Sequence, residues 1–166
     1  GIIAAETVAK APADGYTWLM SSGAYLTIAG LYPKLSFDFM RDFAPVTLMA
    51  SLPWILAVNP AVPAKSVNEF VQLARARPGQ MNYANSGNGT TTHLVTEMFK
   101  NDAKINLVNV PYKGVVAGVT DLLAGQVQVM FTIAQAGVPH VQSGKLRALA
   151  VTSAKRSPAL PEVPTL

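Results

Sequence analysis

After residue 80, the pattern of apolar and polar positions alternates between two periods. Short apolar runs typical of strands are followed by segments whose apolar residues recur at helical spacing. The strands predicted in this way are 81–85, 106–110, 127–132 and 146–152, and the helices are 88–101, 115–123 and 134–142. Strands that alternate with helices over such short connections predict βαβ units and a parallel sheet covered by helices.

The clearest helix is predicted just before this alternation, within residues 63–80. Ser66 and Glu69 have the spacing of a capping box, in which two side chains satisfy backbone N–H groups of the first turn. Apolar residues follow at i, i+3, i+4 and i+7, and Pro78-Gly79 ends the pattern. We therefore expect an amphipathic helix with one face against the core.

The first third of the chain has a less regular pattern. It predicts the end of a helix in residues 1–15, a strand in 16–22, a short helix or turn in 24–32, and two strands in 43–62 that are separated near Ser51 to Pro53. Trp18 and Trp54 fall in these strand-like runs, so both are expected to pack in the core.

Composition indicates a folded protein with a preference for small anions. Half of the 166 residues are hydrophobic, 13% are charged, and the net charge is +4. The basic residues form no run or stripe, so we expect no nucleic-acid partner, and a mild positive potential favours small anions. The absence of cysteine excludes disulfides and thiol chemistry. The longest apolar stretch, 46–58, is interrupted and shorter than the ~20 residues of a membrane span, and no secretory signal is recognised at the start.

The segment "NYANSGNGTTTHL" places a glycine-rich turn between a predicted strand and a predicted helix. In an open parallel sheet, ligands lie outside the carboxyl ends of the strands, and helix N-termini there bind anions through unpaired N–H groups. Loops 86–90, 111–114 and 132–135 are in this position. The first loop therefore has the composition of a carboxylate or phosphate cradle, although a plain strand-to-helix turn with capping side chains explains it equally well. It matches neither the Walker pattern nor G-x-G-x-x-G, which disfavours a nucleotide.

Further candidate residues are few. Tyr112 and Lys113 precede a predicted helix. Tyr112 would form a pocket wall or else pack at an interface. Lys113 would neutralise an anion or else remain solvated. His93 and His140 have no accompanying residues at metal-ligand spacing, and no G-x-S-x-G elbow is present. His93 is best explained as a polar helix residue that pairs with Glu97 one turn later.

Several motifs together resemble one known family. "NYANSGNGTTTHL", "VPYKG", "DLLAGQV" and "GKLRALAVTSAKRSPALPEVPT" are similar to the Bug proteins, the TctC-type periplasmic solute-binding proteins of tripartite tricarboxylate transporters. The resemblance covers nearly the whole chain. It implies an α/β fold like that of periplasmic binding proteins, with two lobes whose parallel-rich sheets are joined by crossing strands. On this basis we expect an incomplete first lobe in residues 1–60 and the second lobe in residues 61–153. Residues 154–166 would cross back towards the first lobe.

The resemblance also assigns ligand-binding positions. The family's ligand loops correspond here to Ser21, Ser22, Gly23 and Ala24, to Ser86, Gly87, Asn88, Gly89 and Thr90, and to Phe131 and Thr132, with Tyr112 and Lys113 beside the same cleft.

This chain departs from the family at three of its positions. The family usually has aspartate at the position of Thr132 and asparagine at that of Ile28, and a hydroxyl residue is common where Ala24 stands. A missing carboxylate at 132 removes a partner for an amine or hydroxyl on the ligand. We therefore hypothesise that the ligand is a less polar organic acid.

The resulting functional hypothesis is a periplasmic, non-enzymatic solute-binding component. It captures a small mono- or dicarboxylate in an inter-lobe cleft and delivers it to the permease subunits of the transporter, without a cofactor, a metal, nucleic acid or direct membrane insertion. The alternatives are a cytosolic α/β enzyme that acts on a carboxylate or phosphate, with His93 as its base, and a truncated copy that binds weakly or not at all.

Overall fold

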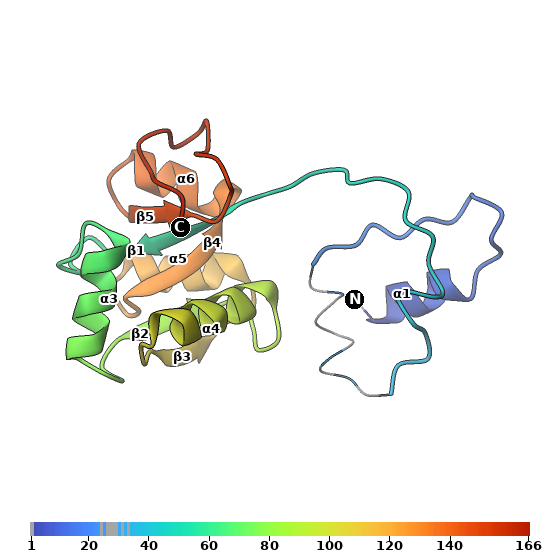
Figure 1. Cartoon of the computed structure of the whole chain (residues 1–166), viewed down its shortest axis with the longest axis horizontal. Coiled ribbons are helices and arrows are strands. Elements are labelled where there is room, and N and C mark those ends of the chain that lie inside the picture. The colour runs from blue at the N-terminus through green and yellow to red at the C-terminus, as the bar shows by residue number, and fades with distance from the viewer. Residues whose placement is uncertain (1, 24, 26–29, 31, 33) are drawn as a thin grey trace. The chain divides into compact units, whose positions relative to one another are not determined.

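The computed structural model describes residues 2–23, 25, 30, 32 and 34–166 (Figure 1). The chain divides into two compact units, residues 1–49 with 89–91 and residues 50–88 with 92–166. The lobe boundaries at residues 60 and 153 stay a prediction.

The second unit is built on a five-stranded sheet in the order β3-β2-β4-β1-β5. Its strands are β1 (Trp54–Val58), β2 (Asn82–Asn85), β3 (Val108–Pro111), β4 (Val129–Ile133) and β5 (Arg147–Val151). β2 is parallel to β3 and β4, whereas β1 is antiparallel to both β4 and β5. The predicted parallel sheet is thus confirmed for the strands of the alternating region, and β1 is inserted among them in the opposite direction.

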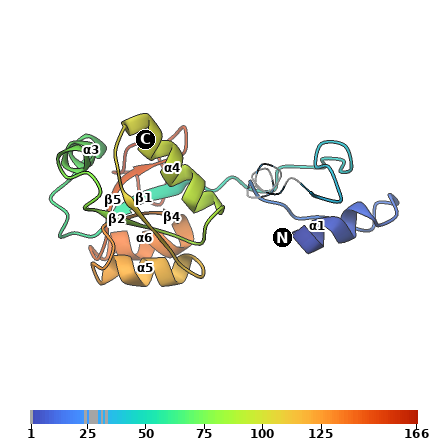
Figure 2. The ribbon, with the colours of Figure 1, turned by 90° about the horizontal axis from the view of Figure 1, so that it is seen from below.

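Helices cover both faces of this sheet. They are α3 (Val67–Ala76), α4 (Thr91–Ala103), α5 (Val115–Leu123) and α6 (Ala134–Gln142). Figure 2 shows α3 and α4 on one face and α5 and α6 on the other. The predicted bounds of α5 and α6 are confirmed, while α4 begins three residues later than expected because the turn before it is longer.

Each face of the sheet has its own hydrophobic cluster, because successive strand residues point to opposite sides. Along β4, Phe131 packs with Phe70 and Phe99 under α3 and α4, whereas its neighbour Met130 packs with Leu122 under α5. These side chains are at most 9% exposed. The middle strands are therefore buried on both faces, which explains their continuous apolar sequences.

The start of α3 differs in one detail from the predicted capping box. Ser66 Oγ accepts a hydrogen bond from the Glu69 N–H at 3.2 Å, as expected. Glu69 Oε2, however, accepts from the N–H of Lys65 at 2.7 Å, one residue before the cap itself. The two side chains still satisfy two donors at the helix start, but the reciprocal bond reaches one residue further back.

The first unit has little regular structure among its described residues. Its helix α1 spans Ile2–Ala9, which confirms the helix expected there. The strands predicted at 16–22 and before Ser51 are wrong, and Trp18 is 65% exposed instead of buried. Only Ala5 and Phe37 of its described hydrophobic side chains are buried, so few tertiary contacts are available to hold extended segments in a sheet. Most of the segment expected at 24–32 lies outside the described residues.

In the described part of the chain, no helix has the length and apolar character needed to cross a membrane.

Candidate functional site

Three helices of the second unit begin at one edge of the sheet. β2, β3 and β4 are adjacent and parallel, so their carboxyl ends share an edge, and α4, α5 and α6 start directly after them. The sheet order therefore brings the loops predicted at 86–90, 111–114 and 132–135 to the same edge. Gly114 and Ile133, the N-caps of α5 and α6, make no side-chain capping bond. Uncapped helix starts of this kind attract anions.

The glycine-rich turn after β2 is held by the protein's own side chains. Gly87 and Gly89 have φ values of 125° and 78°, which explains why glycine occurs there. The N–H of Ser86 donates to Thr92 Oγ1 at 2.9 Å, and the N–H of Gly87 donates to Asn85 Oδ1 at 2.8 Å. The expectation that these two amides are unpaired is therefore wrong in this conformation, and a ligand that used them would first have to displace both side chains.

Three asparagines form a hydrogen-bonded chain beside this turn. Asn85 Nδ2 donates to Asn109 Oδ1, and Asn109 Nδ2 donates to Asn88 Oδ1 at 2.9 Å. Asn85 is fully buried and Asn88 is exposed, so the chain runs from the end of β2 across β3 to the surface. Asn85 and Asn109 are not among the site residues predicted from the sequence. The available signal was the presence of asparagine within strands, where it is disfavoured.

Tyr112 is anchored and Lys113 is solvated. The Tyr112 hydroxyl donates to Asp121 Oδ2 at 2.7 Å, and its N–H donates to the carbonyl of Asn85. Partial burial, and after it the hydrogen bond to Asp121, raise the pKa of Tyr112 to about 12. Lys113 is exposed at the start of α5. Both residues lie at the predicted edge, and their contact with a ligand stays a prediction.

Phe131 and Thr132 are neighbours in β4 that point to opposite faces. The Phe131 ring packs edge-on against Phe99, with 5.7 Å between centroids, which favours a role in the core. Thr132 is fully buried on the α6 side, and its Oγ1 has no hydrogen-bond partner among the residues that the structure describes. A buried hydroxyl without a partner costs about 1–3 kcal/mol, so its retention at this edge is consistent with use by a ligand.

Helix α6 passes close to Thr132 because residue 137 is glycine. A Cβ added at Gly137 would lie 2.7 Å from Thr132 Cγ2, which is closer than van der Waals contact allows. The strand and the start of α6 are thus packed tightly around the unpaired hydroxyl.

The first-unit positions are only partly described. Ser21, Ser22 and Gly23 are exposed and have no regular secondary structure. Ala24 and Ile28 lie outside the described residues. The assignment of this segment to ligand binding stays a prediction.

His93 belongs to a polar cluster that joins α4 to β2. Its Nε2 lies 4.0 Å from Glu97 Oε1, which agrees with the predicted pair. Glu97 also accepts from Lys100 Nζ at 2.7 Å and from the Tyr83 hydroxyl. Partial burial alone would raise the pKa of Glu97, but the bonds from Lys100 and Tyr83 outweigh it and lower that pKa. Because these contacts connect α4 to β2, the cluster is better explained as a structural contact than as a catalytic pair.

No metal site is visible in the described residues, where no group of three or more His, Asp or Glu side chains is arranged to hold an ion.

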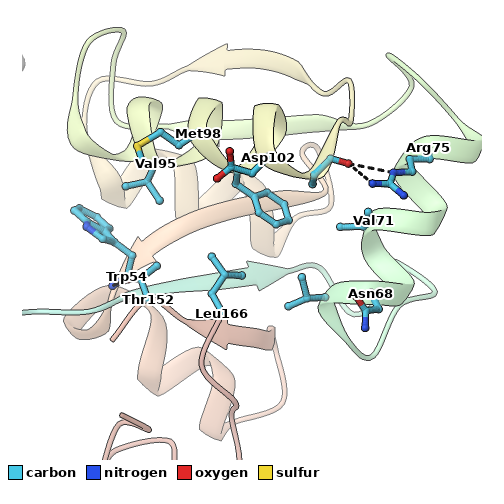
Figure 3. A pocket seen from close by; sticks show the side chains of 12 residues that line it. Trp54, Asn68, Val71, Arg75, Val95, Met98, Asp102, Thr152 and Leu166 are labelled. Carbon is cyan, nitrogen blue, oxygen red and sulfur yellow. Dashed lines mark hydrogen bonds between the residues drawn. The ribbon is translucent and has the colours of Figure 1, made fainter. Parts of the chain in front are cut away.

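An apolar groove of about 580 Å³ lies elsewhere in the second unit, between α3, α4 and the start of β1 (Figure 3). Trp54, Val71 and Met98 line it, and Arg75 at its rim donates to the carbonyl of Ala103 at 2.6 and 3.1 Å. None of the predicted site residues lines this groove. We therefore place the candidate site at the helix starts and not in the groove.

Comparison with known proteins gives the family. The whole chain, residues 1–166, matches the family described as "Tripartite tricarboxylate transporter family receptor", TctC. The chain belongs to this family, and the predicted resemblance is confirmed. It spans about half the length of the curated relatives it matches.

Solved structures agree with this assignment. R. palustris Rpa4515, determined with adipate, is 40% identical with a TM-score of 0.85, covering 100% of this chain and 56% of that one. The periplasmic binding protein BugD is 31% identical with a TM-score of 0.83, and the match covers 99% of this chain and 55% of BugD. MatC from Rhodopseudomonas palustris, with bound malate, is 28% identical with a TM-score of 0.82, and the match covers 99% of this chain and 56% of MatC. The predicted α/β fold of the periplasmic-binding-protein type is thus confirmed.

Proposed function

We propose that this protein is the extracytoplasmic solute-binding component of a tripartite transporter. It captures a small organic carboxylate in a cleft between two lobes and hands it to the permease subunits in the membrane. Membership of the TctC receptor family supports this role, as do relatives with bound adipate and malate. The resemblance to BugD supports a periplasmic location.

One observation in the structure carries the proposal. The buried, unpaired hydroxyl of Thr132 directly precedes α6, whose start has no side-chain cap. A carboxylate at this edge would satisfy the hydroxyl and the first N–H groups of α6. Helix α5, which follows β3 at the same edge of the sheet, also has an uncapped start and adds positive potential. These groups are hydrogen-bond donors suited to an anion, and none of them is a base that could activate the Thr132 hydroxyl.

The enzyme alternative has less support. Its only candidate base was His93, which faces Glu97 in a cluster directed at Tyr83 and Lys100. We propose that the protein has no catalytic activity.

Thr132 also indicates the ligand class. A threonine hydroxyl can donate to a carboxylate, but unlike an aspartate it has no charge to pair with an ammonium group. We propose that an unsubstituted acid such as adipate is preferred over an amino acid or a hydroxy acid.

Calorimetric titration tests both parts of the proposal. Adipate should bind, and aspartate and malate should bind at least about tenfold more weakly, since their ammonium and hydroxyl groups would find no carboxylate partner at position 132. Thr132→Asp should shift the preference toward aspartate. Thr120→Val, which removes an exposed hydroxyl that bonds within α5, is the matched control and should change nothing. The titration should include the longer natural protein if there is one. Tighter binding of aspartate than adipate by the unaltered protein would contradict the proposed ligand class.

A further inference from the structure

The three-asparagine chain has a defined direction, and one backbone group sets it. The Gly87 N–H can only donate, so the Asn85 atom that faces it must be Oδ1. Asn85 then presents Nδ2 to Asn109, which must answer with its own oxygen. Asn109 in turn presents Nδ2 to Asn88, whose Oδ1 accepts at 2.9 Å. The two N–H groups of Asn88 Nδ2 are left over, and they have no partner among the described residues.

We infer that this chain, called here the asparagine relay (Asn85, Asn109 and Asn88), fixes Asn88 as a hydrogen-bond donor to the ligand. Asn85 and Asn109 are then positioning residues that act through Asn88. The inference rests on the proposed function, because it concerns the same loop.

An isolated surface asparagine offers no such selectivity, because it can rotate its amide and present either oxygen or nitrogen. In the relay, rotation of Asn88 would bring its nitrogen against the Asn109 nitrogen and leave two donors facing each other. The buried position of Asn85 makes reversal of the whole relay costly. The relay therefore favours ligand groups that accept, above all an ionised carboxylate, over ammonium groups, which can only donate.

Asn109→Asp tests the direction of the relay. An aspartate of the same shape can accept from Asn85 but cannot donate to Asn88, so Asn88 should rotate and turn its oxygen outward. The matched control is Val108→Asp, which adds the same charge at the adjacent, 43% exposed position of the same strand. Circular dichroism checks folding, and Asn109→Ser, which interrupts the relay without a charge, is the second variant.

Titration with adipate is the first readout. Asn109→Asp should weaken binding by about 30-fold and Asn109→Ser by about 5-fold, whereas Val108→Asp should have less than about 3-fold effect. The loss in Asn109→Asp should persist in 1 M salt, where the Debye length falls to about 3 Å and a simple charge effect is screened. Equal losses in the two aspartate variants, or a loss that disappears in salt, would overturn the inference.

NMR of the ligand-free protein separates this inference from the proposed function. In the unaltered protein, the Asn109 side-chain NH2 should exchange slowly with water and the Asn88 NH2 quickly. In Asn109→Asp, the Asn88 NH2 should become protected. If adipate and malate fail to bind at all while this pattern is observed, the proposed function fails and the relay stands. Slow exchange of the Asn88 NH2 in the unaltered protein would overturn the relay whatever binds.

Discussion

Two turns at the same edge of the sheet differ in how their polar groups are satisfied. The turn after β2, around Ser86, is rich in glycine and hydroxyl groups, and its side chains take up the amides of Ser86 and Gly87. The second turn is the junction where β4, with Thr132 as its next-to-last residue, passes directly into α6; it is mostly apolar, has no side-chain cap at the start of α6 and keeps one buried hydroxyl without a partner among the described residues.

The difference shows that a polar loop is not automatically an open binding site. Side chains that could bind a ligand also bind the nearby backbone, and serine, threonine and asparagine are the residues that do so most readily. An apolar turn has no such internal partners, so its helix start stays available. In the proposed site, the glycine-rich turn would contribute an oriented side chain, and the apolar turn would contribute its backbone and Thr132.

The largest expected effect tests the tight packing of the second turn. Gly137→Val should lower the free energy of unfolding by about 3 kcal/mol, because the new side chain would overlap Thr132 Cγ2. Urea unfolding measures this. In a Thr132→Ser background, which removes Cγ2, Gly137→Ala should cost clearly less than it does alone.

Gly118→Ala is the control for this packing effect. Its Cβ would lie 3.1 Å from the flexible end of Met130 and 3.3 Å from Ala84 Cβ, both farther than the 2.7 Å contact at Gly137, so a smaller loss than for Gly137→Ala is expected. Similar losses at both glycines would contradict the close approach of α6 to Thr132.

The next effect tests the first turn. Thr92→Val should destabilise the protein by about 2 kcal/mol, because it removes the acceptor of the Ser86 N–H and the 2.8 Å contact with Ser86 Oγ. Urea unfolding is again the measurement. An unchanged stability would mean that water or another group replaces Thr92 Oγ1, and the turn would then be open after all.

The opposite sign is expected for the same substitution in the second turn. Thr132→Val replaces a buried hydroxyl that has no partner, so the ligand-free protein should gain about 1 kcal/mol. A loss of stability would show that the hydroxyl is already bonded. The contrast between Thr92→Val and Thr132→Val is the most direct test of the difference between the two turns.

The smallest expected effect is a pH dependence at Glu97 on α4. Its pKa is lower in the folded protein than in the unfolded chain, so its contribution is present above the unfolded value of about 4.3 and is lost as the pH falls through the lowered folded pKa. Since the Glu97 side chain is 40% exposed, screening limits the effect to about 0.5 kcal/mol. Urea midpoints at pH 7 and pH 3 should differ less in Glu97→Gln than in the unaltered protein. An equal difference would exclude Glu97 as a contributor.

Local signals predicted much of the second unit. The periodicity gave the bounds of α5 and α6, and the cap at Ser66 gave the start of α3. The direction of β1 was not predictable, because "WILAV" is apolar throughout and its orientation depends on partners in β4 and β5. The first unit was predicted poorly, since residues such as Trp18 have strand propensity but no described sheet to join.

The position of the three loops at one edge of the sheet was predicted, but the hydrogen bonds within them were not. The place of loops after parallel strands followed from the alternation alone. Which amides stay unpaired depends on side chains that the fold brings together, such as Thr92 with Ser86 and Asn109 with Asn88. Sequence spacing carries no information on these contacts between separate elements.

The antiparallel insertion of β1 has a consequence for how the chain reaches its native state. Ile55 pairs with Thr132 and Val151, so β1 must wait until segments more than 70 residues later in the chain have been synthesised. Ile55, Leu56, Ala57 and Val58, all at most 1% exposed in the finished structure, remain uncovered during that interval. Late pairing of this kind slows folding and leaves an apolar strand open to self-association.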